Sequence, residues 1–247
     1  MSDLLYLYAI VPAEDAASLG SARGIDGGSV RAVVEGQLAG VVGAVPSSDF
    51  EAEPLNENVR SADWLRPRAA AHQEVNAALL ADAGAVVPCA FGTIFREERG
   101  VRELLRSRAA ELAAKLDRVR GRAEWVVTLE RLAPAAVPAR ERAPAASGRG
   151  YLERRRGEQR GRADAQETAV GAAAALEDVL RGCAEDVAPE PLVAAAGPVA
   201  GRWTVLVKRS RAAGLARVLE AFEREWADRG LVARATGPWP AYRTGGA

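Results

Sequence analysis

The first 60 residues consist of short apolar runs joined by polar, glycine-containing connections, a pattern typical of strands. Residues 4–11 are almost wholly apolar and predict a first β-strand. Two β-branched runs at 30–34 and 38–45 flank a Glu-Gly-Gln triplet, and this spacing predicts a β-hairpin. Residues 46–58 are polar and contain two prolines, so we expect a loop there.

After this region the pattern changes to the 3.6-residue period of an amphipathic helix. Ser61 is a good N-cap residue and marks the expected helix start. The apolar stripe of this helix consists of Leu65, His72, Val75 and Leu79. An apolar strand at 85–95 and a second helix at 101–119 follow. We therefore expect a mixed α/β domain over residues 1–120.

The second half of the chain has a recognisable order of elements. We expect strands at 124–130, 192–196, 203–208 and 231–236. Two helices separate them, with apolar stripes at Ala172, Leu176, Val179, Leu180 and Cys183 and at Leu215, Val218, Leu219, Phe222 and Trp226. The order β-α-β-β-α-β is that of the ferredoxin-like fold. The expected fold class is therefore α+β with two domains, the second a ferredoxin-like domain at 121–247 with a mobile loop of proline, alanine and arginine at 132–150.

Charge argues against a nucleic-acid-binding protein. The 247 residues include 33 basic and 33 acidic side chains, whereas such proteins carry a basic excess. All the basic residues except Lys115 and Lys208 are arginines, which indicates a coding bias rather than a function. Arginines also cluster at 154–162, but glutamates interrupt them, so a solvated helix face is the simpler interpretation than an anion-binding one.

The two cysteines and the single histidine leave little room for a metal site. Cys89 and Cys183 are far apart, and no Cys/His spacing typical of a zinc site occurs. Two free thiols are typical of a reducing compartment. The amino terminus lacks the basic region of a signal peptide, and no apolar run reaches the roughly 18 residues of a membrane helix. We therefore expect a cytoplasmic protein without a metal ion.

No catalytic motif is evident. Neither lysine follows a glycine, as a P-loop requires, and the glycine-rich residues 24–28 lead into a strand rather than a helix. A Ser-His-Asp triad would have to use His72. That residue lies on the apolar face of its helix, where a core or interface histidine is the simpler interpretation. We expect no enzyme activity, no catalytic residue and no cofactor.

An unusual segment, Gly-Pro-Trp-Pro-Ala-Tyr at 237–242, follows the last expected strand. Prolines on both sides of Trp239 stiffen the backbone and hold the ring at low entropic cost. Trp239 and Tyr242 can either cap a hydrophobic core or present a docking surface for a partner. The sequence leaves both roles open, with capping the simpler.

Seven segments, in this order, resemble the gas vesicle protein GvpL/GvpF family. They are YLYAIVP, LAGVVGAVPSSDF, the helix with Asp63-Trp64-Leu65, Arg68 and Ala71-His72, VVPCAFGTIF, GRAEWVVTLE, GRGYLERRR and TGPWPAY. The resemblance covers nearly the whole chain. The chain departs from the family pattern at Cys89-Ala90, at Ala241 and at Arg243.

This resemblance implies a non-enzymatic accessory protein of gas vesicle formation, with two domains and a modified ferredoxin-like second domain. It would bind the apolar gas vesicle shell protein and other accessory proteins, in the cytoplasm and at the gas vesicle. An apolar groove or an open sheet edge could hold a shell subunit that would otherwise aggregate. The expected partner-binding residues are His72, Phe91, Trp239, Pro240 and Tyr242. The alternative is a ferredoxin-like protein that binds or converts a small molecule.

Overall fold

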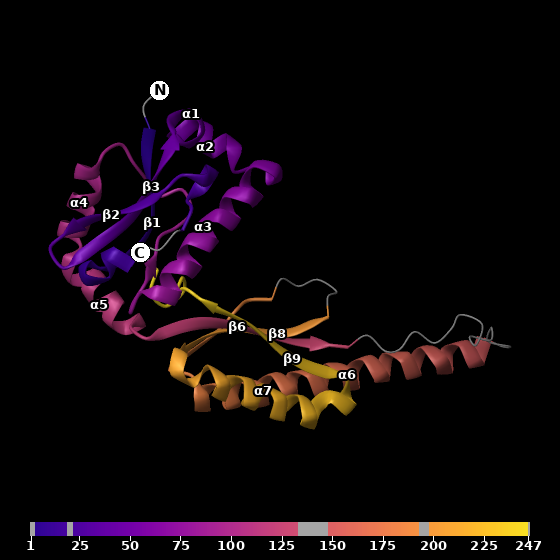
Figure 1. The fold of residues 1–247 in the computed structure, drawn as a ribbon. Coiled ribbons are helices and arrows are strands. Elements are labelled where there is room, and N and C mark those ends of the chain that lie inside the picture. Colours follow the sequence, from indigo (N-terminus) through magenta and orange to yellow (C-terminus); the bar gives the residue numbers. More distant parts are fainter. Residues whose placement is uncertain (1–2, 19–21, 133–147, 193–197, 247) are drawn as a thin grey trace. The chain divides into compact units, whose positions relative to one another are not determined.

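The computed structural model describes residues 3–18, 22–132, 148–192 and 198–246, which form two compact units (Figure 1). Unit 1 is Met1–Glu124 together with Pro238–Ala247, and unit 2 is Trp125–Gly237. The chain thus passes from unit 1 to unit 2 and back. The first crossing lies close to the expected boundary at residue 120. The C-terminal segment belongs to unit 1, however, whereas we expected 121–247 to be one continuous domain.

The sheet of unit 1 is antiparallel and centres on its first strand. Its strands are β1 (Asp3–Pro12), β2 (Val30–Glu35), β3 (Leu38–Pro46), β4 (Val87–Pro88) and β5 (Ile94–Phe95). They lie in the order β2-β3-β1-β4, and β5 also pairs with β1. Glu35 lies opposite Leu38, so the predicted hairpin is confirmed. Gly36 in its turn has a φ of 60°, which glycine adopts without strain.

The helices of unit 1 differ from the prediction in two places. They are α1 (Ser47–Phe50), α2 (Ala52–Asn58), α3 (Ala62–Asp82), α4 (Glu98–Ser107) and α5 (Ala109–Val119), with 3-10 turns η1 (Ala13–Ser18) and η2 (Ile25–Gly27). The expected loop at 46–58 was wrong: its Pro54 lies in the first turn of α2, where no amide hydrogen bond is lost. The expected helix at 101–119 is two helices, because the backbone leaves the helical conformation at Arg108.

Helix α3 packs on the sheet through the stripe that its sequence predicted. The Ser61 hydroxyl accepts a hydrogen bond from the Trp64 N–H (3.4 Å), which confirms the N-cap. His72, Val75 and Leu79 are buried, and the fourth member of the stripe is half-buried. The expected strand at 85–95 pairs only as β4 and β5. Both pair with β1, and α3 contributes to the core that β1 shares.

Unit 2 has the element order that the sequence predicted. Its elements are β6 (Arg122–Arg131), α6 (Gly148–Cys183), β7 (Asp186–Pro189), β8 (Val199–Lys208), η4 (Arg209–Arg211), α7 (Ala212–Trp226), η5 (Ala227–Arg229) and β9 (Leu231–Trp239). The strands lie side by side in the order β7-β8-β6-β9. With two sheets and helices in both units, the α+β fold class is confirmed.

Two expectations in unit 2 fall largely on residues outside the described ones. Of the expected strand at 192–196, residues 193–196 lie outside them, and the described strand β7 comes earlier, at Asp186–Pro189. Of the expected mobile loop at 132–150, residues 133–147 lie outside them. The end of that segment was wrong as a loop, because α6 begins at Gly148.

Both helices of unit 2 bury one apolar face. The buried residues are Ala169, Ala172, Leu176 and Leu180 of α6 and Leu215, Leu219, Phe222 and Trp226 of α7. Val179, an expected member of the α6 stripe, is instead 40% exposed. The first half of α6 extends beyond the other elements of this unit (Figure 1), and residues 151–167 are all exposed.

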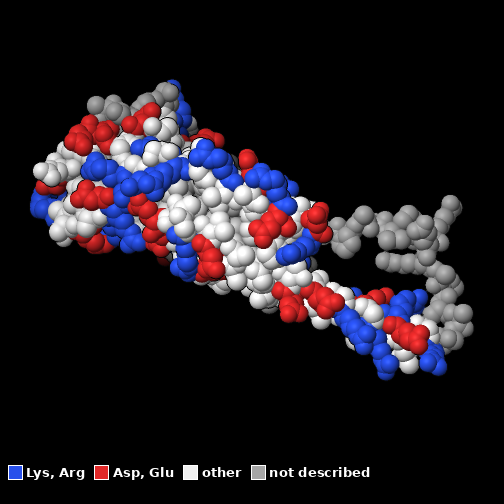
Figure 2. All heavy atoms as spheres, turned by 90° about the horizontal axis from the view of Figure 1, so that it is seen from below, with Lys and Arg blue, Asp and Glu red and all other residues white. Residues whose placement is uncertain are grey.

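Acidic and basic side chains are interspersed over the face drawn in Figure 2. This mixture agrees with the zero formal net charge and gives no uniformly basic surface on that face. Among the described helices, none combines the length and the apolar character that a membrane span requires.

Candidate functional site

Residues from five of the seven sequence segments described above meet in unit 1. They form an aromatic cluster made of Tyr6, Tyr8, Phe50, Trp64, His72, Phe91 and Tyr242. Neighbouring ring centroids lie 4.7–6.4 Å apart, most of them tilted or edge-on, as aromatic pairs prefer. The cluster therefore gathers side chains from β1, α1, α3, the β4–β5 connection and the C-terminal segment.

Tyr6 is the centre of this cluster. It is fully buried on β1, and its ring contacts Phe50, His72 and Phe91 at 5.7–5.9 Å between centroids. Its hydroxyl oxygen accepts a hydrogen bond from the Gly92 N–H (3.1 Å) and lies 2.9 Å from His72 Nδ1. Burial raises the pKa of Tyr6, so the phenol stays protonated.

His72 is held on both ring nitrogens. Nδ1 faces the Tyr6 hydroxyl, and Nε2 lies 3.1 Å from Asn76 Nδ2, which also donates to the His72 carbonyl (3.1 Å). A neutral imidazole has one N–H donor and one acceptor nitrogen, so each ring nitrogen can take part in one of these contacts. Burial lowers the pKa of His72 to about 4. The residue is thus a neutral, fixed part of the core, in line with the structural interpretation from its sequence.

Tyr8, two residues after Tyr6 on the same face of β1, fixes the turn before the hairpin. Its hydroxyl oxygen accepts a hydrogen bond from the Ile25 N–H (2.8 Å). A Cβ atom at Gly24 would lie 2.6 Å from that oxygen. Glycine is therefore required at position 24 by close approach to the cluster.

The C-terminal segment closes one side of the cluster. The Tyr242 ring lies 6.3 Å from that of His72, and its hydroxyl donates to Gln73 Oε1 (2.5 Å). The buried carboxylate of Glu124 accepts hydrogen bonds from the backbone N–H groups of Arg243 and Thr244. Tyr242 is thus held by Gln73, and the two residues after it are held by Glu124.

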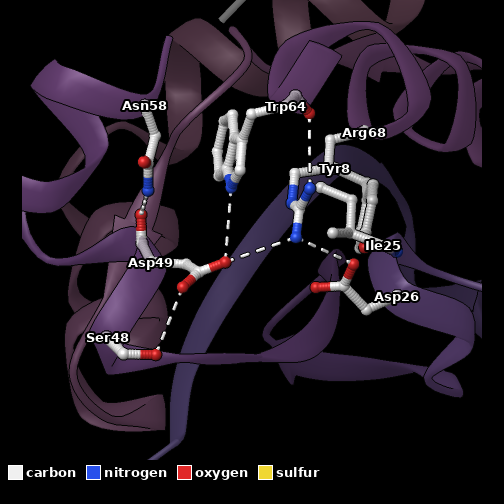
Figure 3. Close-up of polar contacts among 8 residues, drawn as sticks. All are labelled: Tyr8, Ile25, Asp26, Ser48, Asp49, Asn58, Trp64 and Arg68. Carbon is white, nitrogen blue, oxygen red and sulfur yellow. Dashed lines mark hydrogen bonds and ion pairs between the residues drawn. The ribbon is translucent and has the colours of Figure 1, made fainter. Parts of the chain in front are cut away.

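A polar network adjoins the cluster (Figure 3). Arg68 Nη2 lies 3.3 Å from Asp49 Oδ2 and 3.2 Å from Asp26 Oδ1, and Nη1 donates to the Trp64 carbonyl (3.3 Å). The Trp64 indole N–H donates to the same Asp49 oxygen (3.3 Å), and the guanidinium lies 4.4 Å from the indole centroid. Arg68 therefore joins α3, α1 and η2 around the Trp64 ring.

An open cavity of about 400 Å³ borders the cluster at Phe50 and Gly92. It is lined by Leu4, Phe50, Glu51, Ala52, Leu55, Asn56, Gly92, Ile94 and Arg96. Glu51 and Arg96 form an ion pair (3.4 Å) among these residues. The cavity thus combines an aliphatic and aromatic wall with one pair of opposite charges.

The structure brings three of the five expected site residues together. His72, Phe91 and Tyr242 belong to the cluster; His72 is buried, and the other two are half-buried. Trp239 is half-buried and Pro240 is buried, and neither ring is a member of the cluster.

Sequence reasoning missed the roles of Asp49, Arg68 and Glu124. Their residue types carry no signal by themselves, and in the sequence Glu124 is only one position of an expected strand. The run Ser-Ser-Asp-Phe and Arg68 belong to segments that resemble the family, but their convergence depends on packing α1 against α3. A spacing rule within one helix could not have found that contact.

The described residues supply no obvious reactive group at this site. Burial raises the pKa of the Cys89 thiol to about 12, so the nearby cysteine stays protonated. No group of three or more His, Cys, Asp or Glu side chains suited to a metal ion occurs in the described part of the chain. The site can therefore make apolar and aromatic contacts and a few hydrogen bonds.

Comparisons with known proteins identify the family. Residues 4–243 match the model of the family described as gas vesicle synthesis protein GvpL/GvpF. Gas vesicle protein L of Streptomyces sp. (strain CB03234) is 32% identical over 253 residues, covering 98% of this chain and 93% of that protein.

Two crystal structures share the fold. Gas vesicle protein GvpF of Anabaena sp. PCC7120 superposes with a TM-score of 0.72 at 17% identity, covering 100% of this chain and 97% of the other. GvpF of Microcystis aeruginosa gives a TM-score of 0.66 at 16% identity, with 99% of each chain covered. The match of sequence over nearly the whole chain and the match of fold agree: this protein belongs to the GvpL/GvpF family of gas vesicle synthesis proteins.

Proposed function

We propose that this protein is a non-enzymatic accessory protein of gas vesicle formation that binds the apolar shell protein and other accessory proteins during assembly. Membership of the family indicates the role in gas vesicle formation. We place the protein in the cytoplasm and at the growing gas vesicle, where its partners are made and used. We propose no cofactor and no chemical step.

The observation that carries this proposal is the convergence of the family-like segments on one site. Five segments that are far apart in the sequence contribute rings to the aromatic cluster. Its member Phe50 and Gly92, whose N–H donates to Tyr6, also line the adjoining cavity. An apolar side chain of a shell subunit could enter this cavity and lose its contact with water. Burial of apolar surface would then supply the free energy of binding, and no coupled chemical reaction would be needed.

The expected partner-binding residues would act in two ways. Phe91, Trp239 and Tyr242 are half-buried and can touch a partner directly. His72 and Pro240 are buried, so they would hold neighbouring side chains in position. Aromatic residues with part of their surface exposed are the usual anchors of protein interfaces.

We also propose that the two units fold as separate domains and that unit 2 is ferredoxin-like. The order β-α-β-β-α-β along the chain, combined with the spatial order β7-β8-β6-β9, supports that fold. The domain boundary would then follow Glu124, with the C-terminal segment added to the first domain.

A pull-down of the shell protein with the full chain as bait tests the binding site. Ala52 is exposed and lines the cavity, so Ala52→Trp should fill it without entering the core. We expect at least about a 10-fold loss of captured shell protein, because the docking volume is occupied. Ala114→Trp, also at an exposed position but on α5 and outside that cavity, is the matched control and should capture as the unaltered chain does.

Thermal melting of both variants separates a lost site from a lost fold. The proposal requires unchanged melting with reduced capture for Ala52→Trp. Equal capture by the two variants would move the binding site elsewhere. No capture by the unaltered chain would remove the shell protein as partner.

A further inference from the structure

Residues 151–167 of α6 pack little against the rest of the described chain, with Arg131 Nη2 donating to Gln166 Oε1 (2.6 Å). Every residue at 151–167 is exposed, and Gly157 and Gly161 within it weaken an isolated helix. A mostly polar helix that contacts little of its own unit needs another source of stability. This half of α6 is therefore a candidate interaction surface.

Charge divides α6 into two parts of opposite sign. Residues 149–162 contain six arginines and two glutamates, a net charge of +4. Residues 163–178 contain four acidic side chains and no basic one, a net charge of −4. The helix is thus electrically polarised along its length, far beyond the helix dipole.

The outer face of α6 repeats this polarity. We define it by Arg149, Arg160, Glu167 and Asp178, which are separated by 11, 7 and 11 residues. Such spacings are close to whole turns of an α-helix, so the four side chains share one face, opposite the buried Leu176. All four are exposed, and only Arg149 has an ion-pair partner within the described chain, Glu153 at 3.2 Å.

The four charged residues have the same spacings, 11, 7 and 11, when read from either end of the helix, but the signs of their charges are reversed. If a second copy lies antiparallel, with a two-fold axis between residues 163 and 164, Arg149 meets the partner's Asp178 and Arg160 meets the partner's Glu167. Symmetry makes each of these ion pairs occur twice. Leu152 and Val170, exposed by 54% and 60%, flank the same face and would lose water in this contact.

We propose that the outer face of α6 is a self-association surface through which two copies of this chain pair antiparallel. An anionic ligand such as nucleic acid would suit only the first half of the helix and would be repelled by Glu167 and Asp178. A second copy matches both halves at once. Charge complementarity therefore selects a second copy over an anionic ligand.

Charge exchange in the full chain tests this proposal by sedimentation velocity at about 50 mM and about 500 mM NaCl. The first variant is Arg149→Glu with Arg160→Glu, and the second is Glu167→Arg with Asp178→Arg. Each places like charges opposite each other in both symmetric contacts, so each should raise the dimer dissociation constant at least about 10-fold. A 1:1 mixture of the two should form a heterodimer, and the chain with all four substitutions should pair with itself.

Arg154→Glu with Arg155→Glu is the matched control, because it changes the net charge equally but lies off the outer face. It should dimerise as the unaltered chain does, and circular dichroism checks that each variant keeps its helix content. The proposal is overturned if the unaltered chain is monomeric at low salt, or if the control loses the dimer as the first variant does. It is also overturned if neither the mixture nor the fourfold variant recovers the dimer.

Discussion

Thr244 donates two hydrogen bonds to one carboxylate oxygen of Glu124, from its backbone N–H (2.7 Å) and from its hydroxyl (2.8 Å). The two residues are 120 positions apart, and Glu124 is only 4% exposed. A buried carboxylate needs donors around it, and the end of the chain supplies them. The same contact fixes the segment that places Tyr242 beside His72.

Replacing that carboxylate should weaken unit 1. Glu124→Gln replaces one of two acceptor oxygens by an amide nitrogen, which is a donor. That nitrogen would face backbone N–H groups of the C-terminal segment and could not accept from them. We expect a loss of about 1–3 kcal/mol in the free energy of unfolding, measured by urea denaturation. Thr244→Val removes only the hydroxyl donor and should cost about 1 kcal/mol. An unchanged unfolding curve for Glu124→Gln would mean that the contact adds no stability.

Unit 2 should fold without the C-terminal segment. A fragment of residues 121–239 keeps β6 and β9 whole, whereas Tyr242 and Thr244 bond to Gln73 and Glu124 of unit 1. We expect cooperative thermal unfolding of fragment 121–239 at the same midpoint as fragment 121–247. If the longer fragment melts cooperatively and the shorter one does not, the C-terminal segment stabilises unit 2 as well.

His72 should make the stability of unit 1 depend on pH. Its pKa is about 4 in the folded chain, because burial disfavours the charged ring, and 6.5 when exposed. Its contribution is complete above pH 6.5 and is lost as the pH falls toward 4, since only the unfolded chain takes up the proton. Between pH 7.5 and pH 5 we expect a loss of about 2 kcal/mol from this residue.

His72→Gln provides the comparison, because glutamine does not titrate and the carboxylates behave alike in both chains. The difference between the two unfolding free energies should change by that amount over the same pH interval. If the two chains lose stability in parallel, His72 does not carry the pH dependence. If the His72→Gln chain captured less shell protein in a pull-down while its stability was unchanged, His72 would have a binding role.

Arg68 should not be replaceable by lysine. Its guanidinium reaches Asp26, Asp49 and the Trp64 carbonyl at once while lying over the indole ring. An ammonium group has the same charge but lacks the planar fork that serves several partners. We expect Arg68→Lys to lower the free energy of unfolding by about 1–3 kcal/mol in urea denaturation. Arg66→Lys, at an exposed position on the same helix, should have no measurable effect.

Local patterns predicted much of the fold. The hairpin, the Ser61 cap and the order of elements in unit 2 each depend on residues close in sequence, so periodicity and turn chemistry were sufficient. Helices α1 and α2 were missed because residues 46–58 are mostly polar and include Pro46 and Pro54, a composition that alone indicates a loop. The break at Arg108 was missed because the apolar stripe continues through it: Val101, Leu105, Leu112 and Leu116 are all buried.

The candidate site could be predicted only in part. His72, Phe91 and Tyr242 stood out by residue type or by the segment that carries them, and the structure places them together. The position of Tyr242 beside the other two depends on the return of the chain to unit 1 after Gly237, which no local signal encodes. For the same reason the anchor at Glu124 could not be anticipated from a strand pattern that seemed to belong wholly to the second half.

That return of the chain has a consequence for biosynthesis. Residues 238–247 leave the ribosome only after every residue of unit 2, yet they complete the packing around His72 in unit 1. Although domains generally fold from the amino terminus during synthesis, here the amino-terminal unit is the last to be completed. Until Tyr242 has been synthesised, nothing covers the side of the aromatic cluster next to His72. The nascent chain therefore exposes the surface that Tyr242 covers in the finished protein.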